Sequence, residues 1–519
     1  MNKILKLAFA LFVCIFLVEI SSVSNKYVNR PLVTLDVNNI TNPQIKKLVR
    51  KIDNYYALFL LKFSKQQKKH LDQTDSKYQE LPEEKIIYGK KNNFTISSQE
   101  NANNLNNWHR SHGNNASNRF SDLSQININN VENLDVAWKY EFRETMRDIQ
   151  ANPVIAENKI FTPTTNRQVV ALNAKNGKKI WEHNVKGTPA RRVIIYWPGN
   201  DDLASRIYFC VEKELISLYA ENGKPVKTFG KNGSVKLKKR CLISPAIIND
   251  EIIIGTFEPA VEIYNLFSGK LSWKYYLKEK KFNKNRYGGK RYDYSGGNPW
   301  SGISADTERG IVFVSTGNAG YYFNGVNRPG DNKYSNSVVA IDIINKKKLW
   351  DFQEIPHDIW NLDIPAPPIL TSIKKNDLFI DVVVAVTKLG NTLILDRLTG
   401  EPIFDFHLKK APQSKIPGEK TAYYQPNVKI PEPFSKQLFN EKEITNISIE
   451  SKKFIKNKIK NSNFGFFQPH ELDKKTIYFG FHGGAEWMGA SINNKNGIMY
   501  LTSSNTPWEA FVSTRKGNG

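Results

Sequence analysis

One turn motif recurs along the chain and limits the folds that it can adopt. Each copy runs from aliphatic residues through a polar turn to an aromatic residue, as in V-V-A-L-N-A-K-N-G-K-K-I-W at residues 169–181. The closing aromatic residues are Trp138, Trp181, Phe229, Trp273, Trp350 and Phe404. Four of the five intervals between them fall between 43 and 54 residues. Each copy therefore predicts a strand, a tight turn and a second strand, closed by an aromatic residue that docks on a neighbouring unit.

A period of this length, filled with short strands, is typical of the blades of a β-propeller. A β-sandwich would also contain many strands, but it would not repeat one turn motif at this interval. The strand-like runs alternate with a period of two, which excludes a helical solenoid. The sequence therefore predicts an all-β propeller.

The N-terminal residues predict export. Lys3 and Lys6 precede an apolar run at residues 7–18, which is too short to span a bilayer comfortably and suits a secretory signal. Because no clean cleavage site follows, residues 1–24 are either a signal peptide or a retained N-terminal anchor. Residues 42–63 then show apolar side chains at helical spacing with lysines on the other faces. This short helical arm either rests on an anionic membrane surface or packs on the main domain.

With a polar stretch at residues 72–107, which we expect to be loop-like, the arm forms an extension at residues 25–107. The propeller follows at residues 108–519. The formal net charge is +24, but the lysines are scattered and form no basic stripe with interleaved aromatic residues, so we expect no nucleic-acid partner. Cys210 and Cys241 lie in buried strand patterns; a disulfide is allowed, but we expect unpaired thiols. The sequence contains no C-x-x-C-H motif for covalent haem.

The repeats and the loops between them resemble the quinoprotein dehydrogenases that use pyrroloquinoline quinone (PQQ). N-W-H-R-S-H-G-N-N-A-S-N-R-F-S at residue 107, G-N-P-W-S-G at 297 and G-G-A-E-W at 483 follow in the family's order. A-P-Q-S-K-I-P-G-E at 411 is similar to the membrane-type, glucose-dehydrogenase-like branch. The resemblance implies an eight-bladed propeller with tryptophan-docking motifs, of which about six blades can be counted here. The last blades would come from further sequence or from a second chain.

The resemblance also implies the residues that bind PQQ. Trp300 would form the aromatic floor beneath the quinone, and Trp487 would lie near it. Arg192 would contact the ring, because a guanidinium suits paired quinone and carboxylate oxygens. Lys388 would donate a hydrogen bond to the reactive quinone oxygen.

The implied metal is calcium, with magnesium or a lanthanide as alternatives, and its ligands are oxygen atoms. Asn318, in S-T-G-N, matches the family's asparagine ligand. Glu258, in G-T-F-E-P, lies in the region of the glutamate ligand, but the loop is shorter, so Glu258 is either that ligand or outside the site. His109, His112 and His482 show no metal-ligand spacing, and we expect structural or surface roles for them.

The loop H-D-I-W-N-L-D at residues 357–363 resembles the loop that carries the family's catalytic base. The base is the aspartate after the tryptophan, but this position is Asn361, and an amide cannot accept the substrate's proton. Asp363 would lie on the same side if the loop is extended, either as a substitute base or as an additional metal ligand. Asp358 would do so only in a helical turn, and His357 is either a base or a structural residue. We favour Asp363 as a metal ligand and a slowed or altered enzyme.

The resemblance thus implies an exported PQQ-dependent dehydrogenase that oxidises an alcohol, polyol or sugar. Its electrons would pass to a separate quinone or cytochrome, in the periplasm, with or without an anchor in the inner membrane. The alternative is a non-catalytic tryptophan-docking propeller that binds a quinone or acts as a scaffold. Retention of the residues expected around PQQ argues against a scaffold.

Overall fold

The computed structural model describes residues 76–97, 107–142, 151–164, 166–189, 192, 194–278, 286–287, 290–291, 296–320, 322–326, 328–375 and 377–513. The predicted signal at residues 1–24 and the predicted helical arm at residues 42–63 lie outside this part of the chain. Within it, no helix has both the length and the apolar character needed to cross a membrane.

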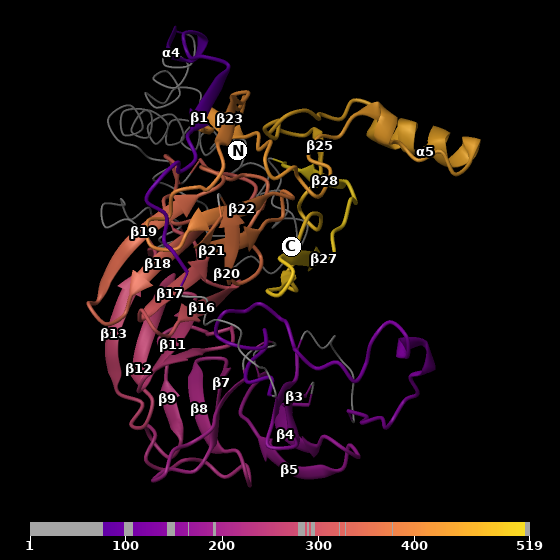
Figure 1. Cartoon of the computed structure of the whole chain (residues 1–519). Helices are drawn as coiled ribbons and strands as arrows, with labels where there is room; N and C mark the ends of the chain where they lie inside the picture. The colour runs from indigo at the N-terminus through magenta and orange to yellow at the C-terminus, as the bar shows by residue number, and fades with distance from the viewer. Residues whose placement is uncertain are drawn as a thin grey trace, which may run out of the picture.

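The described chain is built mainly from antiparallel sheets that follow one another in sequence (Figure 1). The first two sheets comprise β2 (Val154–Ala156), β3 (Lys159–Pro163), β4 (Gln168–Asn173) and β5 (Lys179–Asn184), then β6 (Ile195–Trp197), β7 (Arg206–Val211), β8 (Glu214–Tyr219) and β9 (Ser234–Lys236). The next two comprise β10 (Ala246–Ile248), β11 (Glu251–Thr256), β12 (Ala260–Asn265) and β13 (Leu271–Tyr276), then β16 (Gly302–Asp306), β17 (Ile311–Ser315), β18 (Ser337–Asp342) and β19 (Lys347–Gln353). A fifth unit contains β20 (Ile369–Lys375), β21 (Leu378–Val386) and β22 (Thr392–Asp396), and a sixth contains β26 (Ala490–Asn493) and β27 (Ile498–Leu501).

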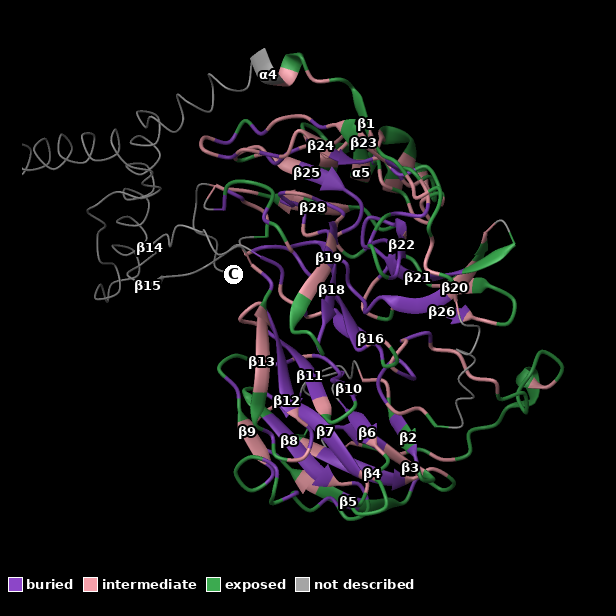
Figure 2. Ribbon diagram, turned by 60° about the vertical axis from the view of Figure 1, so that its left-hand side comes forward, coloured by how far each residue is buried: buried purple, intermediate pink, exposed green. Residues whose placement is uncertain are grey.

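The first strands of successive units lie side by side. Contacts join β2 to β6, β10 to β16, β16 to β20 and β20 to β26. Aliphatic side chains between neighbouring sheets form the hydrophobic clusters of the core, and the buried strands are seen in purple in Figure 2. Burial of these apolar side chains is the main favourable term that holds the sheets face to face. The sheets confirm the predicted all-β propeller, with about six blades within the described residues.

Tryptophan docking is confirmed at three positions. The indole Nε1 donates to the backbone oxygen of Ala174 from Trp138, of Ala220 from Trp181 and of Arg397 from Trp350, at 3.0 to 3.1 Å. Each acceptor lies in the turn of the next unit. Gly223 shows why this turn needs glycine: its φ is +68°, and an added Cβ would lie 2.6 Å from the Trp181 ring.

One segment forms hydrogen bonds with all six units. This axial segment, Trp108–Arg119, exchanges backbone hydrogen bonds of 2.8 to 2.9 Å with the first strand of five of them. These bonds are Trp108 N to Ile155 O, Tyr196 N to His109 O, Ala305 N to Asn115 O, Leu370 N to Ala116 O and Ile492 N to Asn118 O. Arg110 donates to Ser244 O, directly before β10, at 3.2 Å. The first motif of the family resemblance, which begins at residue 107, therefore has a structural role: it connects the units of the propeller.

The remaining elements lie outside these six units. They are α4 (Ser76–Gln79), β1 (Glu84–Ile87), η1 (Val131–Asn133), β14 (Arg286–Tyr287), β15 (Lys290–Arg291), β23 (Phe406–Lys410), β24 (Tyr424–Pro426), η2 (Glu441–Glu443), α5 (Ile449–Ile459), β25 (Lys475–Tyr478) and β28 (Trp508–Phe511). The stretch expected to be loop-like before residue 108 differs from expectation. Its β1 pairs antiparallel with β23, and Thr95 donates to Asp396, so backbone and side-chain bonds tie this polar sequence to the domain.

The segment at residues 135–142 has no strand partner in the described part of the chain. No backbone hydrogen bond joins residues 135–142 to another described segment. Trp138, Tyr140 and Phe142 are nevertheless half-buried and alternate with exposed Lys139 and Glu141, as in a strand with one face covered. The preceding exposed aliphatic residues are Leu123, Ile126, Ile128, Val131, Leu134 and Val136.

The prediction of unpaired thiols was wrong. Cys210 in β7 and Cys241 form a disulfide, with the Cα atoms 5.8 Å apart. Cys241 lies after β9, in the connection that returns toward β10, and not within a strand. The strand pattern therefore could not predict that Cys241 pairs with Cys210. The course of the connection, and not the strand register, brings the two sulfur atoms together.

Candidate functional site

Asp358 organises the loop at residues 357–363. Its buried carboxylate accepts the backbone N–H of Trp360 and of Leu362, both at 2.7 Å, and the amide Nδ2 of Asn336 at 2.8 Å. Burial raises the pKa of Asp358, and the charge of Asp363 raises it further. With three donors on its oxygens, Asp358 fixes the conformation of the loop.

His357 is also held by the protein. Its Nδ1 lies 2.7 Å from Gly330 O, and its Nε2 lies 2.6 Å from Oε1 of Glu419. Both the imidazole and the carboxylate are buried, and the His357 hydrogen bond lowers the pKa of Glu419 against the effect of burial. Because both ring nitrogens have partners, this geometry supports the structural alternative for His357.

Asn361 has a left-handed backbone conformation, with φ at +61°. Asparagine and aspartate tolerate this region better than most residues, so the turn itself accommodates either side chain. The backbone oxygen of Asn361 lies 3.4 Å from Nζ of Lys388. The expected base position therefore borders the predicted cation, but it presents an amide.

Asp363 joins Lys388 and Asn318 in one buried cluster. Its Oδ1 accepts the backbone N–H of Asn318 at 2.5 Å, and its Oδ2 lies 3.4 Å from Nζ of Lys388. Lys388 also donates its backbone N–H to Asp363 O at 3.2 Å. The side-chain Oδ1 of Asn318 is buried and has no hydrogen-bond partner among the described residues. An amide oxygen and a carboxylate, the donor types that calcium prefers, thus lie together.

Trp300 lies beside this cluster, and Arg192 and Trp487 lie beyond it. The Lys388 Nζ is 5.8 Å from the centre of the Trp300 ring. The guanidinium of Arg192 is 5.7 Å from the same ring and 4.8 Å from that of Trp487. Gly317 permits the approach, because an added Cβ would lie 2.5 Å from the Trp300 indole nitrogen and 3.4 Å from an Asp363 oxygen. The structure therefore brings together the four residues predicted to contact PQQ.

The axial segment adds cations that sequence reasoning missed. Arg119 donates to Trp487 O at 3.4 Å, and burial lowers its pKa to about 10. Arg110 is buried as well, with a pKa lowered to about 9. His112 lies near both and near Arg192; burial first, and then these charges, lower its pKa. Neither ring nitrogen of His112 has a partner in the described chain. A concentration of buried positive charge like this one favours an anionic ligand.

Glu258 lies elsewhere. It follows β11, and its carboxylate forms ion pairs with Lys238, at 2.5 Å, and with Lys274. Burial raises the pKa of Glu258, but the hydrogen bonds from these lysines lower it overall. No contact joins Glu258 to Asn318 or Asp363 in the described part of the chain. The structure does not bring Glu258 into the site. Of the two alternatives that the shorter loop left open, this geometry supports the one in which Glu258 lies outside the site.

Glu486 is a carboxylate in the site that sequence reasoning did not select. On one side, Ala485 donates its backbone N–H to Thr387 O at 3.0 Å, next to Lys388. On the other side, Trp487 stacks under the guanidinium described above. The Oε1 of Glu486 is buried and has no hydrogen-bond partner among the described residues. The sequence feature that could have identified Glu486 is its position directly before Trp487 in the G-G-A-E-W motif.

These residues fit PQQ, a flat quinone with three carboxylates. Trp300 offers an aromatic surface, Lys388 and Arg192 offer cations beside it, and the unpartnered Oδ1 of Asn318 offers a ligand for a metal ion. In the described residues, no cluster of three or more His, Cys, Asp or Glu side chains could hold a metal by itself. A metal at Asn318 and Asp363 would therefore need further oxygen ligands, and a bound quinone has them.

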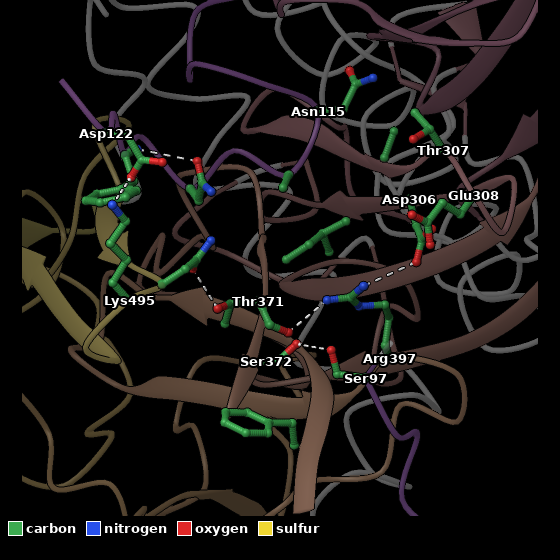
Figure 3. A pocket seen from close by; sticks show the side chains of 17 residues that line it. Ser97, Asn115, Asp122, Asp306, Thr307, Glu308, Thr371, Ser372, Arg397 and Lys495 are labelled. Atoms are coloured by element: carbon green, nitrogen blue, oxygen red, sulfur yellow. Dashed lines mark hydrogen bonds and ion pairs between the residues drawn. The ribbon is translucent and has the colours of Figure 1, made fainter. Parts of the chain in front are cut away.

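A cavity of about 370 Å³ is lined by a different set of residues (Figure 3). Asn115 of the axial segment lines it, together with Asp306, Thr371 and Arg397. Arg397 donates to Thr371 O at 2.8 Å and lies 3.3 Å from the Asp306 carboxylate, as Figure 3 shows. None of the predicted PQQ-binding residues lines this cavity.

Comparison with known proteins identifies the family of this chain. The family model for the glucose/ethanol/alcohol dehydrogenase beta-propeller domain, PQQ, matches residues 108–518. The glycerol dehydrogenase large subunit of Gluconobacter thailandicus is 27% identical over 429 residues, which cover 74% of this chain and 58% of the relative. Quinoprotein glucose dehydrogenase A of Acinetobacter calcoaceticus is 25% identical over 443 residues, covering 73% and 54%.

Comparison with solved structures agrees with the propeller fold. The crystal structure of quinohemoprotein alcohol dehydrogenase from Comamonas testosteroni superposes with a TM-score of 0.57 at 21% identity, covering 79% of this chain and 59% of that one. The chain spans little more than half the length of the curated relatives that it matches. The match of the family model over most of the chain, together with the propeller fold, shows that the protein belongs to the PQQ-dependent quinoprotein dehydrogenase family, through its beta-propeller domain.

Proposed function

We propose that this chain, within a completed propeller, is a PQQ-dependent dehydrogenase that oxidises an alcohol, a polyol or a sugar. The observation that carries the proposal is the convergence of Lys388, Trp300 and Arg192 beside the Asp363–Asn318 pair. These residues come from loops that are far apart in sequence, and a propeller has no structural need for two cations and an indole at one place.

Each residue has a role in this proposal. Trp300 supports the quinone ring by stacking. Arg192 binds anionic oxygens, and Lys388 donates a hydrogen bond to the oxygen at which negative charge develops. Asn318 and Asp363 hold calcium, or magnesium or a lanthanide, through oxygen ligands. When bound, PQQ supplies the oxidant that accepts two electrons from the substrate.

The electron acceptor in this proposal is a separate quinone or cytochrome, because the sequence has no motif for covalent haem. The proposed location is the periplasm, with contact to the inner membrane through the N-terminal residues. The Cys210–Cys241 disulfide supports export, since disulfides persist in oxidising compartments. Activity with a dye but with no quinone or cytochrome would contradict this part of the proposal.

The completed ring requires further strands, which further sequence or a second polypeptide would supply. For a second polypeptide, residues 135–142, which have no described strand partner, and the exposed aliphatic residues before them offer an apolar surface. Strand addition to such an edge is a common mode of recognition. Native mass spectrometry of the 519-residue chain, alone and with the last two blades of a family relative as the probe, tests the idea. A complex supports it, and a lone chain under both conditions contradicts it.

Titration of the apoprotein with PQQ tests the proposed function. With calcium present, the quinone absorbance should shift and saturate; after chelation the shift should disappear. Trp273→Ala, on the outer strand β13, should behave as the wild type, whereas Trp300→Ala should bind weakly. An equal shift without any metal, or no shift under any condition, would contradict the assignment.

One observation favours a non-catalytic alternative, in which the propeller binds a quinone or a protein partner without turning over. It is Asn361, at the position where the family resemblance places the base. Quinone binding with no turnover for any alcohol or sugar, in a completed ring, would support this second function.

A further inference from the structure

The site lacks the expected base at Asn361 but contains a carboxylate with no assigned role. Glu486 is anchored on both sides within the G-G-A-E-W loop: Ala485 binds the turn that carries Lys388, and Trp487 lies under Arg192. The backbone of Glu486 is therefore held between the turn that carries Lys388 and the ring that Arg192 covers, and the charges of both cations act on its carboxyl group. The Glu486 Oε1 is buried without a partner among the described residues, and a buried carboxylate oxygen without a hydrogen bond is costly.

The charges around Glu486 are those of the site. Burial is the largest influence and raises its pKa. The positive charges of Lys388 and Arg192 lower the pKa, and the negative charge of Asp363 raises it. The net shift is upward, which brings the carboxyl toward the range in which a general base works efficiently near neutral pH.

We propose that Glu486 is the catalytic base of this chain, replacing the carboxylate that is missing at Asn361. This inference rests on the proposed function and adds a residue to it. The other candidates are occupied: Asp358 receives three donors, His357 is bonded through both ring nitrogens, and Asp363 is bonded to Asn318 and Lys388. Glu486 alone among them has an oxygen without a partner in the described chain.

The step balances with the oxidant of the proposed function. The O–H bond of the alcohol breaks and its proton passes to Oε1 of Glu486. When bound, PQQ would supply the two-electron oxidant: it would take the hydrogen and electron pair of the adjacent C–H bond, so that the alcohol would become a carbonyl and the quinone would be reduced. Glu486 then releases the proton to solvent. The positive charges of Lys388 and Arg192 favour the return of Glu486 to its ionised form.

Four variants of the full chain, assembled with whatever completes its ring, test the proposal. They are Glu486→Gln, Glu486→Asp, Asn361→Asp and the double variant Glu486→Gln with Asn361→Asp. Glu486→Gln should lower turnover by about 10²–10⁴-fold, because it removes a general base, and should leave a tightly bound quinone. Glu486→Asp should retain part of the wild-type turnover. The double variant should recover turnover, because Asn361→Asp supplies a carboxylate at the position where the family resemblance places the base. Glu509→Gln, in exposed β28, is the matched control.

Two pH measurements separate a base from a structural residue. Wild-type turnover should rise with pH as Glu486 ionises, and this acid limb should be absent from the residual rate of Glu486→Gln. In the apoprotein, PQQ affinity should fall as Glu486 becomes an anion beside an anionic ligand, and Glu486→Gln should remove the fall. This second readout does not depend on turnover.

The outcomes distinguish the inference from the function on which it rests. Wild-type turnover in Glu486→Gln, with quinone bound, would overturn the role of Glu486 and leave the dehydrogenase proposal intact. Loss of turnover in Asp363→Asn, with normal metal and quinone affinity, would show that Asp363 and not Glu486 is the catalytic base. Failure of the wild type to bind PQQ at any pH would overturn the proposed function, and the role of Glu486 with it.

Discussion

Asn318 and Asp363 are joined by a hydrogen bond of 2.5 Å, from the backbone N–H of Asn318 to Oδ1 of Asp363, although 45 residues separate them in the sequence. The bond fixes the Asp363 carboxylate against the backbone of Asn318, whose side-chain Oδ1 has no hydrogen-bond partner among the described residues. The contact therefore leaves that amide oxygen free for the metal-ligand role proposed above.

Asp363→Asn should weaken calcium binding by about tenfold or more, because an amide replaces a charged ligand. Calorimetric titration of calcium in the presence of PQQ measures the change. Asn318→Ala should have a similar effect, and Asp377→Asn, on an exposed turn, should have none. Unchanged calcium affinity in Asp363→Asn would show that Asp363 is not a ligand.

Gly317→Ala should weaken quinone binding although the indole remains. The added Cβ would lie 2.5 Å from the Trp300 nitrogen, so the ring must move. Trp300→Ala should cost more, about 3 kcal/mol or roughly 150-fold in affinity, as expected for lost aromatic burial. Quenching of tryptophan fluorescence by PQQ reports both. Tight binding in Trp300→Ala would remove the residue from the site.

Glu354→Gln should stabilise the protein at pH 8 and leave it almost unchanged at pH 4.5. Glu354 is fully buried, and burial raises its pKa to about 8, while Thr387 and Asn391 donate to its Oε1. Between pH 4.5 and 8 the unfolded chain has released this proton and the folded protein retains it, so stability falls with rising pH. The slope is about 1.4 kcal/mol per pH unit, giving an upper limit of about 5 kcal/mol.

Thermal unfolding of wild type and Glu354→Gln across this pH range checks that prediction. The difference in Tm should grow steadily from pH 4.5 to 8 and then level off. Glu471→Gln, with an exposed ion pair to Lys415, is the control and should show no such growth. A constant difference at all pH values would mean that Glu354 is ionised in the folded protein.

Replacing both Cys210 and Cys241 by alanine should lower the free energy of unfolding by about 3–4 kcal/mol. The disulfide closes a loop over a sequence separation of 31 residues and so restricts the unfolded chain. Urea denaturation with and without a reductant measures the effect. The reductant should destabilise the wild type and not the double variant; a wild type indifferent to reduction would contradict the pairing.

The amides of residues 136–142 should exchange with solvent rapidly in the isolated chain. They have no backbone partner in the described structure, whereas the amides of β4 are bonded on both sides. Hydrogen exchange followed by mass spectrometry compares the two segments. Addition of the polypeptide that completes the ring should protect the first segment and leave β4 unchanged. Equal protection without that polypeptide would contradict an unpaired segment at residues 136–142.

Much of this architecture could be predicted because the propeller repeats one local pattern. The aromatic residues at Trp138, Trp181 and Trp350 dock on the following turn as their spacing predicts. The residues implied by the resemblance, Trp300 and Lys388 among them, also come together, since a family preserves the loops that carry a site as well as the strands that hold them.

The unpredicted part depends on neighbours that no local pattern specifies. Glu258 fits a ligand position by sequence, but a shorter loop directs it to Lys238 and Lys274. The Cys210–Cys241 bond depends on the course of a connection and not on a strand register. Glu486 and Arg119 gain importance only from the charges that tertiary structure places around them.

The axial segment determines how the loss of a local contact affects the stability of the whole domain. In a linear repeat protein each unit depends on its neighbours, so the loss of one contact stays local. Here Trp108–Arg119 binds all six units, so its displacement would loosen every unit at the same time. The stability of each blade is thereby tied to that of blades it never touches, and the described domain should unfold in one step and not blade by blade.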